Sequence, residues 1–294
     1  MTQTVGMLGT GDMGSAVGSV LRRAGYRVVT ALDGRSAASR ELASRAGLED
    51  LGSLEEVLAN CDLFLSILPP AAALGFARQA AAILRGLGRE VVYAECNAVA
   101  PATLLEIAAL FNGAPVRFVD VGIVGPAPKP KASNPTRFYV AGIDRRVLLD
   151  LAVAEISPID MGESIGRASA IKMCYAAMNK GVDALYASIL LASCQLGVNE
   201  ELMREFQASQ PEAAGRMARR IPFMAATAER FTGEMAEIAA TFDAVGVSGD
   251  FHRGAQWLYA LLARSALANE TRATLPAERS LDEALAAFAQ VLQR

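Results

Sequence analysis

Short apolar runs alternate with Ala-rich stretches over roughly the first 160 residues of the chain. The runs are VGMLG, RVVTAL, DLFLSILP, REVVYAE and VRFVDVGIVG. Apolar runs of this length, separated by helix-length stretches, are typical of β-α units that feed a parallel sheet. The segment GPAPKPKASNPTRFYVAG then interrupts the pattern with prolines. It predicts a loop followed by one more strand, TRFYVAG, at an edge of the sheet or antiparallel to its neighbour.

After PIDMGESIG the strand pattern stops, and helical periodicity continues from about Gly166, with breaks near Pro211, Pro222, 246–249 and Pro276. The chain is therefore predicted to have an α/β fold with two domains. Residues 1–163 would form a Rossmann domain with a doubly wound, mostly parallel sheet, and residues 164–294 an all-α domain. A first long helix, over about residues 164–195, would join the two.

Composition narrows the classes of partner. The formal net charge is −3 and the pI near 5.4, without a block of Lys and Arg that could neutralise a row of phosphates. The sequence begins without an export signal, and its apolar runs are too short to span a bilayer. We expect a cytoplasmic protein that binds neither nucleic acid nor membranes.

Cysteine and histidine usage argues against a metal site. Cys61, Cys96, Cys174 and Cys194 have no CxxC spacing, and His252 is the only histidine. We predict reduced, mostly buried thiols and no metal.

A glycine motif follows the first predicted strand. Gly9, Gly11 and Gly14 form G-x-G-x-x-G between TVGML and an amphipathic helix that ends at Gly25. In a dinucleotide site such glycines serve the turn, the approach to the pyrophosphate and close helix packing, and the helix N-terminus binds phosphate. We predict that this loop binds a dinucleotide through Gly9, Thr10, Gly11, Asp12, Met13 and Gly14.

The end of the second strand, TALDGRS, gives conflicting indications about the adenosine ribose. Asp33 suits the 2′-OH of NAD(H), whereas Arg35 and Ser36 suit the 2′-phosphate of NADP(H). Counting from Gly9, the usual acidic position falls on Leu32. We therefore favour NADP(H), with NAD(H) as the alternative; a solvated Asp33–Arg35 turn pair without a binding role is the third interpretation.

Four segments in order, GTGDMG, DLFLSILPP, ECNAVAPAT and FVDVGIVG, resemble the β-hydroxyacid dehydrogenase family, which includes 3-hydroxyisobutyrate and 6-phosphogluconate dehydrogenases. The C-terminal half resembles a little-characterised phosphogluconate-dehydrogenase-like subgroup. The resemblance implies that Leu68, Pro69 and Asn97 border the nicotinamide, with Asn97 also in a catalytic role. It also implies a homodimer.

The resemblance places the catalytic lysine at Lys172, in GRASAIKMCYAAMNKG. A partly desolvated amine can act as general base or acid at a hydroxyl carbon, because burial lowers the pKa of a lysine. Tyr175 and Asn179 follow on the same helical face and are candidate catalytic residues, with Tyr175 also a substrate contact; ordinary interface packing is the alternative. The family amide four residues after the lysine is replaced here by Ala176. We expect Lys180 to be a solvated or ion-paired surface residue.

The substrate loop departs from the family pattern. The family presents a Ser and two glycines, but this chain has Val124 at the Ser position and retains Gly125. Backbone amides near Gly122 and Gly125 are candidate anion donors, with Lys129, Lys131 and Arg137 close in sequence; a solvated basic loop is the alternative. In the second domain the resemblance makes Glu234, Met235, His252 and Trp257 candidate pocket residues, and a lone histidine such as His252 is more often structural.

These features favour an NAD(P)-dependent dehydrogenase that interconverts a small β-hydroxy acid with its semialdehyde or keto acid, with Lys172 as general acid/base. The substrate would be a small molecule, with an anionic group as one option. An imine reductase is the alternative enzyme. The replacements at Val124 and Ala176 leave open a non-catalytic NAD(P)-binding sensor or scaffold.

Overall fold

A computed structural model describes residues 3–130, 133–151, 153–270 and 274–292 of the chain. Two compact units divide it, Met1–Met173 and Cys174–Arg294. The division falls inside helix α7 (Arg167–Leu196), the long helix that the sequence predicts between two domains. Lys131 lies outside the described residues.

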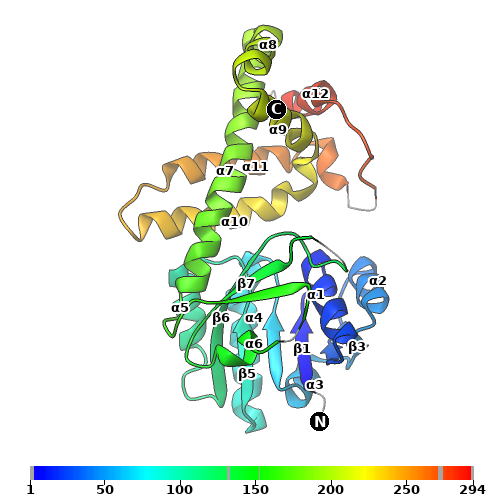
Figure 1. The fold of residues 1–294 in the computed structure, drawn as a ribbon, viewed down its shortest axis with the longest axis vertical. Coiled ribbons are helices and arrows are strands. Elements are labelled where there is room, and N and C mark those ends of the chain that lie inside the picture. The colour runs from blue at the N-terminus through cyan, green and yellow to red at the C-terminus, as the bar shows by residue number, and fades with distance from the viewer. Residues whose placement is uncertain (1–2, 131–132, 152, 271–273, 293–294) are drawn as a thin grey trace. The chain divides into compact units, whose positions relative to one another are not determined.

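The first unit is built on one sheet with the strand order β3-β2-β1-β4-β5-β6-β7-β8 within the described residues (Figure 1). Neighbouring strands from β3 to β6 are parallel, β7 is antiparallel to β6, and β8 is parallel to β7. The strands are β1 (Thr4–Leu8), β2 (Arg27–Thr30), β3 (Glu49–Asp50), β4 (Leu63–Ser66), β5 (Val91–Glu95), β6 (Val116–Val124), β7 (Thr136–Ala141) and β8 (Ile156–Asp160).

This order confirms the predicted doubly wound, mostly parallel Rossmann fold, since β1 lies between two crossovers of opposite direction. Strand β7 is antiparallel, as TRFYVAG predicted. It is not an edge strand, however, because β8 pairs with its outer side. The sequence pattern did not single out β8, which contains Pro158; a proline is tolerated there because β8 lies at the edge of the sheet.

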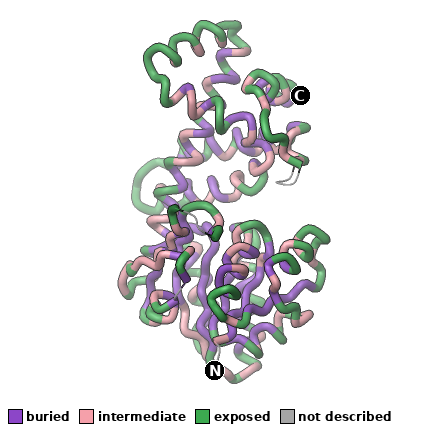
Figure 2. Tube along the Cα trace, turned by 45° about the vertical axis from the view of Figure 1, so that its right-hand side comes forward, coloured by how far each residue is buried: buried purple, intermediate pink, exposed green. Residues whose placement is uncertain are grey.

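Helices cover both faces of the sheet, so the central strands β1, β4 and β5 bury both of their sides, whereas the edge strand β3 is exposed. One core packs helices α1 (Asp12–Arg23) and α2 (Ala37–Ala46) against the sheet, and the other packs helices α3 (Leu54–Asn60), α4 (Pro70–Leu87) and α5 (Pro101–Ala109). A short helix, α6 (Arg146–Leu149), contributes Leu148 to the first core. Figure 2 shows these strands as nearly continuous buried trace. Burial on both faces explains why the strands read as continuous apolar runs.

On the face covered by α3, α4 and α5, two rows of side chains cross the sheet. Phe64, Tyr93 and Phe118 lie in register on β4, β5 and β6, and their rings stack at centroid distances of 5.6 and 5.9 Å. Two residues further along the same strands come Ser66, Glu95 and Asp120, also in register and all buried. We call these three residues the polar row. It lies where the parallel strands end, which is the edge where doubly wound sheets bind ligands.

The second unit is all helical within the described residues, as predicted. Two of the predicted breaks start or interrupt elements: Pro211 opens α9, and Pro222 lies in a short 3₁₀ turn. After α7 its helices are α8 (Asn199–Ser209), α9 (Pro211–Arg220), α10 (Ala228–Asp243), α11 (Asp250–Leu262) and α12 (Leu281–Leu292), with 3₁₀ turns at Ile221–Phe223, Ala225–Thr227 and Ala266–Asn269. None of the helices in the described part of the chain is long and apolar enough to cross a membrane.

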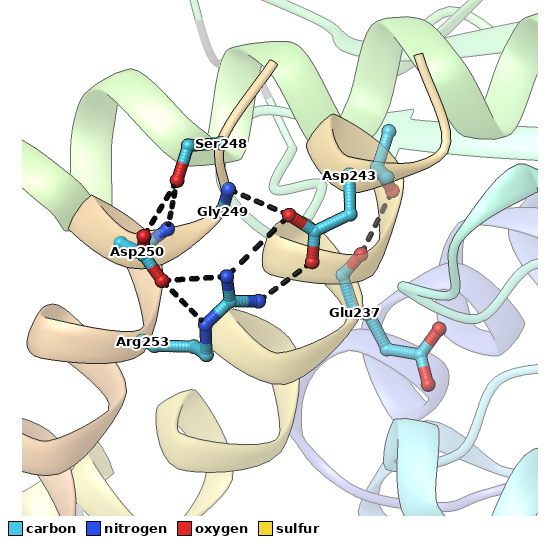
Figure 3. Close-up of polar contacts among 7 residues, drawn as sticks. Glu237, Asp243, Ser248, Gly249, Asp250 and Arg253 are labelled. Atoms are coloured by element: carbon cyan, nitrogen blue, oxygen red, sulfur yellow. Dashed lines mark hydrogen bonds and ion pairs between the residues drawn. The ribbon is translucent and has the colours of Figure 1, made fainter. Parts of the chain in front are cut away.

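The turn between α10 and α11 is held by an exposed cluster of charged groups (Figure 3). Arg253 binds Asp243 and Asp250, each at 2.6 Å, and Asp243 Oδ1 accepts the Gly249 N–H at 2.8 Å. Ser248, just before α11, accepts the Asp250 N–H at 3.2 Å and donates its hydroxyl to Asp250 Oδ2 at 2.8 Å. A Cβ at position 249 would lie 2.7 Å from the Ala239 carbonyl oxygen, so glycine lets the two helices approach closely.

The cysteines are free thiols in the described structure. Cys61 and Cys96 are buried, but Cys194 is partly exposed and Cys174 exposed. The prediction of mostly buried thiols is therefore wrong for the two on α7, whose outward-facing positions the helical pattern of an Ala-rich segment does not reveal. No cluster of His, Cys, Asp or Glu among the described residues could hold a metal ion.

Candidate active site

The glycine loop links β1 to α1 with the geometry that each glycine requires. Gly9 has φ +100°, and a Cβ there would lie 1.7 Å from the Ile67 carbonyl oxygen. A Cβ at Gly14 would lie 1.8 Å from the Gly9 carbonyl oxygen, whereas one at Gly11 would meet nothing within 4 Å. Gly9 and Gly14 therefore permit the close turn and helix packing, and Gly11 leaves space beside the first turn of α1.

Two features of this loop fit a dinucleotide. The space at Gly11 lies at the N-cap of α1, where the positive end of the helix dipole favours an anion. Thr10 is 3% exposed, and its Oγ1 has no hydrogen-bond partner within the described residues. A buried hydroxyl without a partner is costly, so a ligand atom there would satisfy it. Asp12 is exposed and Met13 packs on the first core.

The loop after β2 is a tight turn that leads into α2. Arg35 N–H donates to the Leu32 carbonyl at 3.1 Å, and Gly34 has φ +69°. Ser36 is the N-cap of α2 and accepts the Ser39 N–H at 3.2 Å. Asp33 is exposed, and Leu32, which occupies the usual acidic position, is buried in the core.

Arg40, which the sequence analysis did not single out, lies beside Arg35: its Nε donates to the Arg35 carbonyl at 3.3 Å. One arginine thus precedes α2 and a second lies in its first turn.

The segments after β4 and β5 are tied together by Asn97. Its Oδ1 accepts the Leu68 N–H, and its Nδ2 donates to Ser66 Oγ at 3.0 Å. Asn97 is 2% exposed, so its amide group is committed to these bonds. Leu68 is partly exposed, and Pro69 is exposed at the N-cap of α4. Within the first unit, Asn97 positions the predicted nicotinamide border through these contacts.

Lys172 reaches the same segment from the first turns of α7. Its Nζ donates to the Cys96 carbonyl at 3.1 Å, next to Asn97 in the chain. Gly122 permits this approach: a Cβ there would lie 2.2 Å from the Ala168 carbonyl oxygen and 3.3 Å from the Lys172 Cβ. The structure thus brings together Lys172, Asn97 and Gly122, which the sequence places far apart.

Asp120 anchors the start of α7 on β6. Its Oδ2 accepts N–H bonds from Gly166 at 2.7 Å, Ala168 at 3.0 Å and Ser169 at 3.3 Å, and its Oδ1 accepts the Ser169 hydroxyl at 2.7 Å. Burial raises the pKa of this carboxyl, and the four donors oppose the rise. Asp120 satisfies amides that a helix start leaves unpaired, and so it fixes the helix that carries Lys172.

Glu95, the central member of the polar row, is 1% exposed. Its Oε1 accepts the Asn97 N–H at 3.0 Å and its Oε2 the Tyr93 hydroxyl at 3.4 Å. Burial raises the pKa of Glu95 to about 8, while bonds from Asn97 and Ser66 and the charge of Lys172 lower it. Sequence reasoning gave Glu95 and Asp120 no role, because a carboxyl at a strand end has no local feature that reveals its burial.

The position of the family serine, Val124 at the end of β6, is both apolar and buried in this chain. Val124 is 4% exposed, and Gly125 follows with φ +111°. Arg137 is the register partner of Val124 on the antiparallel strand β7. Residues 122, 124 and 137 share one face of the sheet, which α7 covers at Gly122. Arg137 is partly exposed, and Lys129 is exposed.

Tyr175 and Asn179 belong to the second unit, on the part of α7 beyond Met173. Tyr175 is 45% exposed, and Asn179 Nδ2 donates to the Tyr175 carbonyl at 3.1 Å. Ala176 is buried. Catalytic roles for Tyr175 and Asn179 stay predictions.

The other candidates of the second unit have structural contacts. Glu234 pairs with Lys180 at 2.9 Å, and both side chains are largely buried, so Lys180 is ion-paired, one of the two states predicted for it, but is not a surface residue. His252 packs between the rings of Phe242 and Phe251, and burial lowers its pKa. Two further candidates differ in exposure: Met235 is fully buried and Trp257 is 59% exposed.

Comparison with protein families matches both parts of the chain. Residues 4–147 match the NAD binding domain of 6-phosphogluconate dehydrogenase. Residues 194–262 match a domain of unknown function, DUF1932. An uncharacterised 28.5 kDa protein of Methanothermus fervidus is 23% identical over 199 residues, which cover 68% of this chain and 74% of that protein.

Solved structures share the fold along most of the chain. A conserved protein of unknown function, described as structurally similar to 3-hydroxyacid dehydrogenases, is 29% identical with a TM-score of 0.61 and covers 88% of this chain and 98% of its own. The 3-hydroxyisobutyrate dehydrogenase of Mycobacterium tuberculosis, solved with L-serine, has a TM-score of 0.67 at 18% identity over the full length of both chains. At that identity the likeness concerns the fold.

The glycine loop and the matched NAD binding domain together define the class of protein. The chain carries an NAD binding domain of the 6-phosphogluconate dehydrogenase type, followed by a DUF1932 region in its helical half, and these domains mark it as an NAD(P)-dependent dehydrogenase or reductase. This agrees with the resemblance read from the sequence.

Proposed function

We propose that this protein interconverts a small β-hydroxy acid with its semialdehyde or keto acid, with Lys172 as the general acid/base. The observation that carries the proposal is the bond from Lys172 Nζ to the Cys96 carbonyl. It holds an amine at the carboxyl end of β5, beside Asn97 and the Leu68 loop, where the resemblance locates the nicotinamide. A bound nicotinamide would supply hydride chemistry.

The proton at Lys172 Nζ is the contribution of this chain to that chemistry. In oxidation the amine takes the proton of the substrate hydroxyl, and in reduction it returns a proton to the carbonyl oxygen. The Cys96 carbonyl accepts one N–H of the lysine and so orients the remaining positions on nitrogen. Asp120 and Gly122 fix the helix that carries it.

Arg137 supports an anionic substrate. It shares the sheet face of Gly122 and has no ion-pair partner within the described residues. A guanidinium binds a carboxylate with two parallel bonds, which would compensate for the missing serine at Val124. Amides near Gly122 and Gly125 are further donors, as the sequence suggested.

For the cofactor we propose NADP(H). Arg40 binds the Arg35 carbonyl at the N-terminus of α2, where helix amides and the guanidinium groups of these two residues would suit a 2′-phosphate. Asp33 is exposed and lies one residue beyond the usual acidic position, so it gives weaker support to NAD(H). Titration of the protein fluorescence with both cofactors, for wild type and Arg35→Ala, tests this preference.

The experiment for the reaction is nicotinamide absorbance during turnover with β-hydroxy acids, semialdehydes and cyclic imines. Lys172→Ala should lower kcat for the acid by about 10²- to 10⁴-fold. Arg204→Ala is the control, because this arginine is 70% exposed on α8 and belongs to no candidate site. Imine reduction that is indifferent to Lys172→Ala would favour the imine reductase, and cofactor binding without turnover would favour the sensor.

A homodimer and a cytoplasmic location complete the proposal, and sedimentation of the protein tests the first.

A further inference from the structure

The polar row places two buried carboxyl groups next to each other on neighbouring strands. Glu95 and Asp120 are register partners on β5 and β6. Asp120 receives four hydrogen bonds from the start of α7, a donor set that suits a carboxylate. Like charges directly opposite on paired strands are unfavourable, so the two groups need not share one protonation state.

Glu95 and Lys172 bind opposite edges of a single peptide group. The Lys172 amine donates to the Cys96 carbonyl oxygen at 3.1 Å, and Glu95 Oε1 accepts the Asn97 N–H at 3.0 Å. Those two backbone atoms belong to the peptide bond between Cys96 and Asn97. Because they are about 2.3 Å apart, the amine and the carboxyl oxygen lie at most roughly 8 to 9 Å apart.

We propose that Glu95 is a positioning residue for the Lys172 chemistry: its carboxyl, held across the Cys96–Asn97 peptide group from the Lys172 amine, sets the proton affinity of that amine. The inference rests on the proposed function for its catalytic consequence. The electrostatic coupling itself belongs to the folded protein and is independent of turnover.

The surroundings of the pair make this coupling effective. The Tyr93 hydroxyl on β5 and the Ser66 hydroxyl on β4 bond to Glu95. Burial raises the pKa of Tyr93 and of Cys96, the residue after β5, so both groups are neutral. The Asp120 carboxyl on β6 is bonded to the start of α7. Lys172 is the cation whose charge lowers the pKa of Glu95. Burial raises the pKa of Glu95 to about 8, so its charge changes within the working range of an enzyme.

Coupling between two ionisable groups is reciprocal, and this fixes the sign of the effect. Lys172 lowers the pKa of Glu95, so an ionised Glu95 raises the titration midpoint of Lys172 by the same interaction. Two charges roughly 8 to 9 Å apart at an effective dielectric constant of about 20 shift each other by about one to one and a half pH units. Removal of the carboxyl should therefore make Lys172 lose its proton at lower pH.

The test is an NMR titration of the cofactor-free protein after ¹³C reductive methylation. The lysines of the chain are Lys129, Lys131, Lys172 and Lys180, and the Lys172 signal is assigned by its loss in Lys172→Arg. We expect Glu95→Gln to lower the Lys172 midpoint by about one pH unit. Glu90→Gln is the matched control, since Glu90 is 62% exposed just before β5 and should leave the midpoint unchanged. An unchanged midpoint in Glu95→Gln overturns the inference.

A carboxyl titration and a pH profile of turnover test the same coupling between Glu95 and Lys172. If Glu95→Gln does not fold, the carboxyl signal of Glu95 is titrated in wild type and Lys172→Met, and a midpoint that fails to rise in Lys172→Met overturns the inference. In turnover, the acidic limb of kcat/KM for oxidation should move to lower pH in Glu95→Gln, whereas a merely structural loss lowers kcat without moving the limb. Turnover that survives Lys172→Met, with the NMR coupling present, would refute the proposed function alone.

Discussion

The two units hold their buried charges in different ways. In the helical unit, each buried carboxylate is matched by cations: Glu234 by Lys180, and Asp183 by Arg216 at 2.8 Å and Arg220 at 3.0 Å. In the Rossmann unit, Glu95 and Asp120 are held mainly by amides and hydroxyls. Paired charges keep one protonation state, whereas a carboxyl among neutral donors can change its state near neutral pH.

The buried carboxyl groups of the two units have different roles. The pairs of the helical unit connect helices to one another: Asp183 on α7 binds two arginines of α9, and Lys180 on α7 binds Glu234 on α10. In the Rossmann unit, Glu95 lies instead at the carboxyl end of β5, beside the peptide group that binds the proposed general base, and Asp120 lies opposite it in the middle of β6. We interpret the first set as packing contacts and the second as part of the active site.

The largest effect is expected where one carboxylate serves several donors. Asp120→Ala would leave three amide groups at the start of α7 without an acceptor, and should lower the free energy of unfolding by about 4 kcal/mol. Denaturant unfolding monitored by circular dichroism measures it. Asp62→Ala is the control, because Asp62 also accepts a backbone N–H, from Thr4, but is 54% exposed. Equal losses in both variants would contradict the anchoring role of Asp120.

The pH dependence of stability should also distinguish the units. The pKa of Glu95 is raised from 4.5 to about 8 in the folded state, so between these values the unfolded chain releases a proton that the folded chain keeps. Stability from this group is complete below about pH 4.5 and is lost as the pH rises toward 8, at up to about 1.4 kcal/mol per pH unit. Thermal unfolding at several pH values should show this slope in wild type and not in Glu95→Gln.

A double-mutant cycle tests the pairing in the helical unit. Lys180→Met leaves Glu234 with only the distant Arg230, at 3.8 Å, and should cost about 2 kcal/mol of stability. Glu234→Gln should cost a similar amount, and the double variant clearly less than the sum, because it removes both charges together. Urea unfolding of the four proteins gives the coupling, and strict additivity would exclude a structural ion pair.

The smallest effect is expected at the exposed α10–α11 turn. Arg253→Ala removes the contacts to Asp243 and Asp250 (Figure 3), but the three side chains are between 44% and 81% exposed. The Tm should fall less than in Lys180→Met, and the difference from wild type should shrink at high salt, since screening weakens exposed pairs. A larger fall in Arg253→Ala than in Lys180→Met would reverse our ranking of the two contacts.

Much of the fold could be predicted because its determinants are local. The β-α alternation, the G-x-G-x-x-G loop and the change to helical periodicity near Gly166 are each visible within a short window of sequence. Strands β3 and β8 were missed: β3 has two residues, and β8 contains Pro158. Their pairing depends on the neighbouring strand rather than on their own pattern.

The candidate site could be predicted only in part for the same reason. Lys172, Asn97 and Leu68 came from a family resemblance, and their contacts in the first unit agree with a shared location. Glu95 and Asp120 came from no pattern, although both lie in segments that carried the resemblance. Arg40 was also missed, although it follows the candidate Ser36 by about one helical turn.

The sequence by itself determined the Rossmann loop and the helical second half, because glycine geometry and residue periodicity act over neighbouring residues. Lys172 on the long helix was singled out by the resemblance to a family. Only the tertiary structure decided which carboxyls are buried and what they bind. The register of β4, β5 and β6 sets Ser66, Glu95 and Asp120 in one row, and α7 brings Lys172 to the Cys96–Asn97 peptide group. The protonation of a buried group depends on such non-local neighbours, so chemistry of this kind is fixed when the chain folds.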